Sequence, residues 1–257
     1  MSFLVIAVAA FAAALLTFYS GFGLGTLLMP VIALFFPIEI AIAVTAVVHL
    51  VNNLLKAVLV GRQASFPVFL RFGIPAILAA LIGALLLVSL VNVPPVTQYT
   101  LADEVVSISP VKLVIGILIL GFVVIELLPS LAGVRISSKW LPLGGVISGF
   151  FGGLSGHQGA FRSMFLLGTG LDKHVFIATG VVIAVAVDLT RLIIYGSTSL
   201  GAANDIDWLL VGVAGASALA GTILAKRLLE KITIQSVRNL VAALLIVVGI
   251  GLISGLL

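Results

Sequence analysis

The stretch Ser155-Gly156-His157-Gln158-Gly159-Ala160-Phe161-Arg162-Ser163 interrupts a long apolar region with glycines and strongly polar side chains. Glycine lets the backbone leave helical geometry, and an arginine inside apolar sequence needs a polar partner or water. A plainer version, Ser20-Gly21-Phe22-Gly23-Leu24-Gly25-Thr26, lies 135 residues earlier (155 − 20). Interruptions at matching places in two halves of an apolar chain are typical of a transporter binding site.

The composition places nearly the whole chain in a membrane. Of its 257 residues, 62% are hydrophobic and 9% are charged, and the mean hydropathy is +1.38. At ~20 residues for each membrane-spanning helix, the apolar runs leave no stretch long enough for a separate soluble domain. The net charge is +4, but the bases stand at the ends of apolar runs, which indicates membrane orientation and argues against nucleic-acid binding. The absence of cysteine excludes disulfides and thiolate chemistry.

The expected fold class is an all-α polytopic membrane protein. Ten apolar segments are predicted, at residues 2–19, 22–36, 38–60, 67–91, 111–129, 140–154, 157–171, 173–196, 207–229 and 235–256. The second and seventh are short for a full crossing and follow the glycine clusters, so they could be half-helices whose freed backbone is covered by protein. Eight full spans with two partial ones are therefore an alternative to ten. The longest polar stretch, 92–110, is expected to be a loop.

Basic residues gather on one side of the predicted membrane. In the ten-segment arrangement that side holds Arg62, Arg71, Arg135, Lys139, Lys173, Lys226, Arg227, Lys231 and Arg238. The opposite side has Lys112 as its one clear base. The positive-inside rule makes the basic side cytoplasmic and puts both termini outside. Residues 1–129 then form a first membrane repeat, 130–139 a cytoplasmic linker and 140–257 a second membrane repeat.

The two halves align without a gap over residues 20–61 and 155–196. In this alignment Asn53 falls on Asp188, and Lys56 falls on Arg191. Because each half has five segments, the second half enters the membrane from the opposite side. The sequence therefore predicts two inverted five-segment repeats with broken or short helices after the glycine clusters, an architecture of many secondary transporters.

These features resemble the sulfite exporter TauE/SafE family of membrane transporters, over essentially the whole chain. The match to the family's first glycine motif is carried by Gly21, Gly23, Gly25 and Pro30. The stretch 155–165, followed by Ala178-Thr179-Gly180, is similar to the second motif, but a glycine run leading to proline is usual there. We therefore interpret the chain as a branch with a GHQGAFRS second motif, to which the family's named substrate is not transferred. The resemblance implies transport of small anions, often sulfur oxyanions or organosulfonates, across the cytoplasmic membrane.

Both short segments would begin inside the membrane, where a helix start presents unpaired N–H groups. In an inverted repeat the two starts would face each other, which suits an oxyanion because N–H donors hold it without a buried full charge. Arg162 could add a fork of donors. The predicted anion-binding residues are Gly21, Gly23, Gly25, Thr26, Ser155, Gly156, His157, Gln158, Gly159 and Arg162.

Each of these interpretations has an alternative. The glycines could serve only close helix packing, although a GxxxG spacing says little in a chain with 27 glycines. Arg162 could extend to the cytoplasmic interface. His157 could bind the ligand or carry a proton, or it could be a neutral ring that caps the helix start.

Polar residues also share one face of the third and eighth segments. Asp188 and Arg191, three apart, are predicted to form an ion pair, with Asn53 and Lys56 as their counterparts in the first half. Extension of Lys56 and Arg191 toward their helix ends is the alternative. The residues expected to couple or gate transport are His49, Asn53, Lys56, Asp188 and Arg191, with Asp188 or His49 as the proton-binding group.

The sequence therefore predicts a multi-pass secondary transporter in the cytoplasmic membrane for a small anion such as sulfite, an organosulfonate or a related carboxylate, coupled to protons. The alternative is a passive anion channel with the same central site. No enzyme activity, cofactor or metal is expected, because the three histidines lack metal-site spacing and Ser155 and His157 do not share a helical face. The expected partners are the anion and the lipid bilayer. The direction of transport and the oligomeric state stay open.

Overall fold

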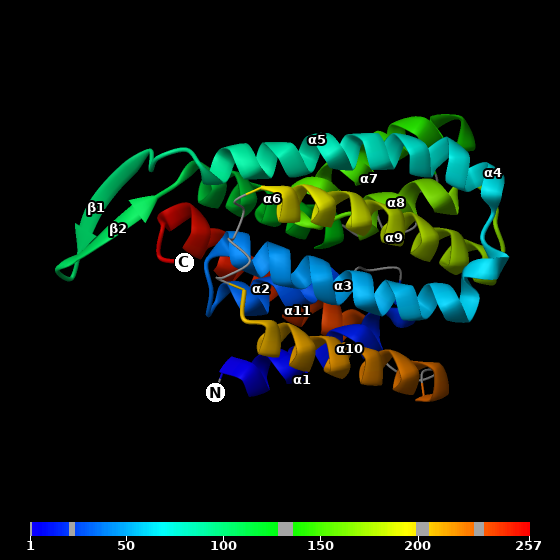
Figure 1. The fold of residues 1–257 in the computed structure, drawn as a ribbon, viewed down its shortest axis with the longest axis horizontal. Helices are drawn as coiled ribbons and strands as arrows, with labels where there is room; N and C mark the ends of the chain where they lie inside the picture. Colours follow the sequence, from blue (N-terminus) through cyan, green and yellow to red (C-terminus); the bar gives the residue numbers. More distant parts are fainter. Residues whose placement is uncertain (1, 21–23, 128–135, 199–205, 229–233) are drawn as a thin grey trace.

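The computed structural model describes residues 2–20, 24–127, 136–198, 206–228 and 234–257. The described helices lie roughly along one direction, and a single β-hairpin projects from one end (Figure 1). In chain order the elements are α1 (Ser2–Ser20), α2 (Leu24–Ala33), α3 (Ile38–Val60), η1 (Gly61–Gln63), α4 (Phe66–Val68), η2 (Phe69–Gly73), α5 (Ile74–Val91), β1 (Thr97–Leu101), β2 (Glu104–Ile108), α6 (Pro110–Leu127), η3 (Ser138–Trp140), α7 (Leu141–Ser155), α8 (Gly159–Leu167), α9 (Lys173–Ser197), α10 (Trp208–Leu228) and α11 (Ile234–Ser254).

The helices have the lengths and apolarity of a polytopic membrane protein. Among the described residues, four helices are long and apolar enough to cross a membrane, namely Ile38–Gln63, Phe66–Val91, Lys173–Ser197 and Trp208–Ala225. By contrast, α2 has 10 residues and α8 has 9. At ~1.5 Å for each residue they extend about 15 Å, half of the hydrocarbon thickness. The prediction that the segments after the glycine clusters are short is confirmed, and the structure favours the arrangement in which these two are partial.

The main helix contacts between the two halves are related to one another by exchange of the halves. Helix α1 packs along α10 and α5 along α7, while α3 packs against α9 and α6 against α11. The contacts of α3 with α10 and of α5 with α9 are related in the same way. In Figure 1, α3 and α9 run in opposite directions beside each other. Exchanging the two halves converts this set of contacts into itself. The inverted repeat and the repeat boundaries stay predictions.

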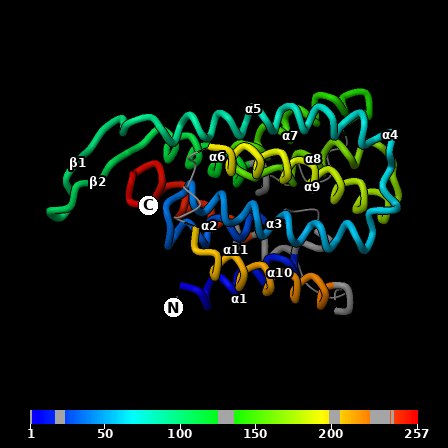
Figure 2. Tube along the Cα trace, in the orientation of Figure 1, coloured from blue at the N-terminus to red at the C-terminus, as the bar shows by residue number. Residues whose placement is uncertain are grey.

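The two ends of the bundle differ in their connections. At one end, Arg71 donates a hydrogen bond to the carbonyl oxygen of Ser138 in η3, at 3.4 Å. The trace in Figure 2 shows the hairpin, the C-terminus and the start of α1 at the other end. The first end carries the connections for which the sequence predicts a cytoplasmic location, and that orientation stays a prediction.

The β-hairpin corrects the expectation of a loop at 92–110. Strands β1 and β2 pair antiparallel from Thr97 opposite Ile108 to Leu101 opposite Glu104. The turn residues Ala102 and Asp103 have φ of 50° and 66°, which is the geometry of a tight two-residue hairpin turn. That turn type usually carries Asn-Gly or Asp-Gly, so Ala-Asp provided no signal. The Tyr99 hydroxyl donates to the carbonyl oxygen of Ser254 at 2.6 Å, which fastens the hairpin to α11.

Glycines permit the close packing of α7 against the η2–α5 segment. Three glycines spaced four apart along α7 each face a backbone carbonyl of that segment, so that an added methyl group would overlap it: Gly145 faces Phe72, Gly149 faces Ala76 and Gly153 faces Ala80. Small residues that let backbones approach are a common basis of helix association in membranes. The GxxxG spacing, which the sequence alone left uninformative, is therefore a packing surface in this helix.

Replacing Gly149 by alanine should destabilise the protein, because the new methyl group meets the Ala76 backbone, which cannot rotate away. Over-packing of this kind costs about 1–3 kcal/mol. Thermal unfolding of the purified protein in detergent measures the effect. Gly212→Ala is the matched control, since a methyl group there meets nothing within 4 Å. Equal unfolding temperatures of the two variants would contradict the packing role.

Candidate functional site

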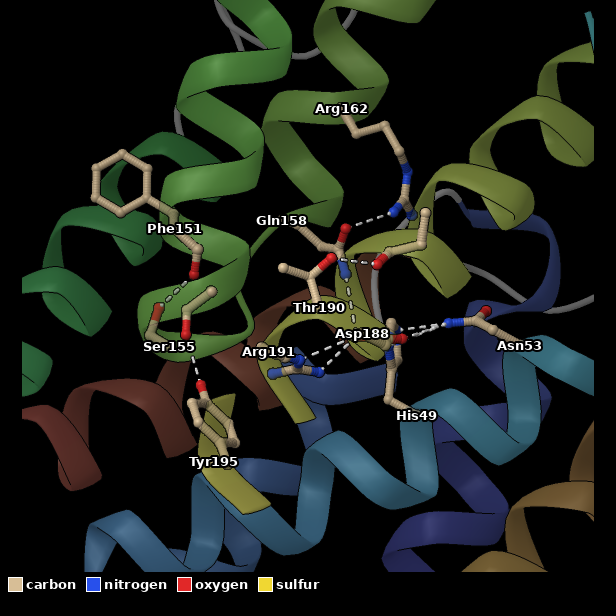
Figure 3. A network of polar contacts seen from close by, with 12 residues as sticks. His49, Asn53, Phe151, Ser155, Gln158, Arg162, Asp188, Thr190, Arg191 and Tyr195 are labelled. Carbon is tan, nitrogen blue, oxygen red and sulfur yellow. Dashed lines mark hydrogen bonds and ion pairs between the residues drawn. The ribbon is translucent and has the colours of Figure 1, made fainter. Parts of the chain in front are cut away.

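The carboxylate of Asp188 lies at the centre of a buried polar network that joins α3, α9 and the break between α7 and α8 (Figure 3). Its Oδ2 atom lies 2.6 Å from His49 Nδ1 and accepts a hydrogen bond from Asn53 Nδ2 at 3.3 Å. Its Oδ1 atom accepts from Arg191 Nε at 3.1 Å and Nη2 at 2.7 Å, and from Gln158 Nε2 at 3.3 Å. The carboxylate therefore binds one half of the chain with one oxygen and the other half with the other oxygen.

Helix periodicity accounts for part of this network. Asp188 and Arg191 are three apart on α9, and the predicted ion pair between them is confirmed. His49 and Asn53 are four apart on α3, so they point together toward α9. The sequence reasoning missed that both contact Asp188 directly. A signal was present, because Asn53 aligns with Asp188 between the halves, and in the predicted inverted repeat equivalent residues near the two-fold axis would meet each other.

The basic side chains of the network point into the protein. Arg191 is 1% exposed and Lys56 is 7% exposed, so the alternative that they extend to the lipid interface is wrong. Arg162 is partly buried and donates from Nη1 to Gln158 Oε1 at 3.2 Å, and Figure 3 shows it directed toward Gln158. Its positive charge acts on Lys56 and on His49. Arg162 is therefore a second cation near the carboxylate of Asp188.

The chain breaks at Gly156, between α7 and α8. Gly156 has φ of +83°, a left-handed conformation that costs glycine little. The N–H of Gln158 donates to the Gly156 carbonyl oxygen at 3.0 Å, and α8 begins at Gly159. A Cβ atom at position 156 would lie 2.7 Å from Arg191 Nη1. This position therefore requires glycine both for the turn and for the approach of the guanidinium.

The start of α2 lies beside this break. A Cβ atom added to Gly25 would lie 3.7 Å from the Gly156 carbonyl oxygen and 3.5 Å from Thr45 Cγ2. Residues from the two glycine clusters are thus neighbours inside the protein. Gly25 and Thr26 are buried in the first turn of α2, whereas the predicted site residues Gly21 and Gly23 lie outside the described residues. We call the place where Gly25, Gly156, Thr45 and Arg191 meet the glycine junction.

Polar atoms around the glycine junction lack partners. Thr45 Oγ1, Arg191 Nη1 and His157 Nε2 are buried without a hydrogen-bond partner among the described residues. A buried polar group without a partner costs about 1–3 kcal/mol, so a bound group that pairs with these atoms would remove that cost. The fourth such atom, Asn52 Nδ2, belongs to a side chain whose Oδ1 accepts from Thr222 Oγ1 on α10 at 2.5 Å.

An aromatic cluster covers one side of the break. The His157 ring stacks on Phe122 of α6 at a centroid distance of 4.8 Å, and its Nδ1 lies 3.1 Å from Ser155 Oγ. Phe151 stacks on Phe161 at 5.3 Å, and both meet Phe122 edge-on. These two contacts fix His157 between α6 and the break. The N-cap position of α8 is Gln158, whose side chain makes no capping hydrogen bond.

A comparison with protein families identifies one match. The family model described as Sulfite exporter TauE/SafE matches residues 6–252. Neither the curated proteins nor the solved structures contain a match to the chain.

Asp188→Asn should strongly destabilise the protein, because it leaves the buried Arg191 cation without its counter-charge while it preserves the shape of the side chain. Breaking a buried charge pair from one side costs roughly 3–5 kcal/mol. Thermal unfolding in detergent checks this. Asp172→Asn is the matched control, since Asp172 is an exposed helix cap that asparagine replaces well. Equal losses in the two variants would show that Asp188 does not hold the network together.

Proposed function

The chain belongs to the sulfite exporter TauE/SafE family, whose members are membrane transporters, and we propose that it is a secondary transporter that moves a small anion across the cytoplasmic membrane. Sulfite, an organosulfonate or a related small carboxylate is the substrate class. The family implies anion export, and the long apolar helices place the protein in a membrane as a multi-pass protein.

One observation carries the assignment of the binding site to the glycine junction. The buried Arg191 guanidinium turns Nη1 toward Gly156, and Nη1 has no hydrogen-bond partner among the described residues. A guanidinium binds oxyanions through paired N–H donors. An anion at the glycine junction would supply the partner that Nη1 lacks.

The surroundings of the junction add further donors. The first N–H groups of α2 and α8 have no acceptor within their own helices, and helix starts favour negative charge. Thr45, whose methyl group faces Gly25, has a buried hydroxyl without a partner among the described residues, which is a third kind of donor. Arg162 adds positive charge from α8. Several donors from different elements suit an anion with several oxygens, as in a sulfonate, a sulfur oxyanion or a carboxylate.

Burial of the network favours a transporter over a channel. Asp188 is 0% exposed and Arg191 is 1% exposed, and the aromatic cluster of Phe122, Phe151, His157 and Phe161 covers the break. An anion therefore reaches Arg191 only after these contacts open on one side, which is the requirement of alternating access. A channel would keep a continuous path open past the same residues.

Purified protein in liposomes should move radiolabelled sulfite, thiosulfate, an organosulfonate or a small carboxylate in saturable fashion. Flux that follows only the gradient of the anion and does not saturate would favour the channel. Absence of flux for every one of these anions would contradict the proposed function.

Thr45→Val should weaken anion binding about tenfold or more, because a hydrogen bond to a charged group contributes about 1.5–3 kcal/mol. The empty protein should keep its stability, since the lost hydroxyl has no partner there. Thermal shift with and without the transported anion measures both quantities. Thr222→Val is the matched control. It should lower the stability of the empty protein, because it removes the hydrogen bond to Asn52, and it should leave anion binding unchanged, because the glycine junction is intact. Unchanged anion binding in Thr45→Val would move the site elsewhere.

Arg162→Ala should lower anion flux, because it removes a positive charge and the donor that holds Gln158. The liposome assay measures it against Arg62→Ala, a control at an exposed arginine of η1. Equal flux from the two variants would remove Arg162 from the set of site residues.

A further inference from the structure

We propose that Asp188 is an internal substitute for the transported anion, which holds Arg191 while the site is empty and releases it when a proton binds at the contact between Asp188 and His49. This inference rests on the proposed function, because it takes the anion to bind at Arg191. It assigns the coupling ion, a proton, and the residue through which anion binding and proton binding affect each other.

The guanidinium of Arg191 contacts Asp188 with two of its nitrogens and faces the glycine junction with the third. Its Nε and Nη2 atoms donate to Asp188 Oδ1, and its Nη1 atom faces Gly156. A bidentate contact with an anion at the glycine junction would use the Nη1–Nη2 edge. Nη2 is therefore the contested atom, because it binds either Asp188 or the incoming anion.

The two oxygens of the Asp188 carboxylate also have different partners. Oδ1 accepts from Arg191 and Gln158, whereas Oδ2 faces His49 and Asn53 on α3. A proton that binds at the 2.6 Å contact with His49 cancels the net negative charge there, either by protonating Oδ2 itself or by forming an imidazolium that offsets the carboxylate. Neutralisation on the α3 side weakens the attraction of Oδ1 for Arg191 on the α9 side.

Few other charged groups face Asp188. Helix α3 contributes His49, α8 contributes Arg162, and α9 contributes Arg191 and Tyr195, while Lys56 of α3 interacts with Arg162. Helices α5 and α7, which also pack on α9, have no titratable side chain. The arginines of η1 and η2 are exposed at the bundle end. Asp188 is the one acidic residue among the described buried residues.

Competition for Arg191 sets the ratio of protons to anions. An anion that takes Nη2 removes a hydrogen bond from the buried carboxylate of Asp188 and places a second negative group beside it, which is costly at low dielectric. One proton at the Asp188–His49 contact removes that cost. In this step the bond from Nη2 to Oδ1 breaks, a bond from Nη2 to an anion oxygen forms, and the proton comes from the aqueous phase. Release of the anion returns the proton.

The test is proton uptake on anion binding to the wild-type protein in weakly buffered detergent solution with a pH indicator. Thiosulfate and methanesulfonate are the probes, because neither takes up a proton near neutral pH. Binding of methanesulfonate, the monovalent probe, should take up about one proton for each anion bound. Its apparent Kd should rise up to about tenfold for each pH unit, by linkage. Anion binding without proton uptake would overturn this inference and leave the proposed function standing. Absence of binding of either probe would count against both.

Two variants locate the proton. Asp188→Asn should bind the anion without proton uptake and with a Kd independent of pH. Because this variant is expected to be less stable, His49→Gln provides a second measurement, as it keeps the Asp188–Arg191 pair and removes the imidazole. His49→Gln should shift the pH at which proton uptake occurs. Asp172→Asn, at an exposed helix cap, should behave as wild type. Wild-type proton uptake in both His49→Gln and Asp188→Asn would overturn the assignment.

Discussion

The structure of this protein depends on the hydrogen bonds and ion pairs that the carboxylate of Asp188 makes. It is fully buried, and donors from α3, from the α7–α8 break and from α9 converge on it. A charge in such a place is tolerated only when it is paired and hydrogen-bonded on every side. The same contacts therefore hold the two halves of the chain together and keep the guanidinium of Arg191 beside the glycine junction.

Glycine serves two different purposes around this centre. Along α7, Gly145, Gly149 and Gly153 bring two helix backbones into contact, and their role is packing. At the break, Gly156 adopts a left-handed conformation and leaves room for Arg191. The first group supports the second, because close packing of α7 fixes the position of its C-terminal end, where the chain turns toward the site.

Much of the fold could be predicted because long apolar runs in a membrane have few structural options. The short segments after the glycine clusters and the Asp188–Arg191 pair followed from local spacing. The hairpin of β1 and β2 did not, since its Ala102-Asp103 turn lacks the residues that usually mark one. Nor did the contact of His49 with Asp188, which joins residues 139 apart. Its position depends on how α3 packs against α9.

The sequence by itself determined that this chain is a polytopic membrane protein with two interrupted segments, because hydropathy, glycine clusters and helical spacing are local properties. It also contained the alignment of Asn53 with Asp188, which predicts their contact if the two halves form the predicted inverted repeat. Only the tertiary structure decided which polar groups satisfy one another and which remain without partners. That outcome depends on side-chain contacts between helices. Among the described residues they leave Arg191 Nη1, which faces Gly156, and the buried hydroxyl of Thr45 without hydrogen-bond partners.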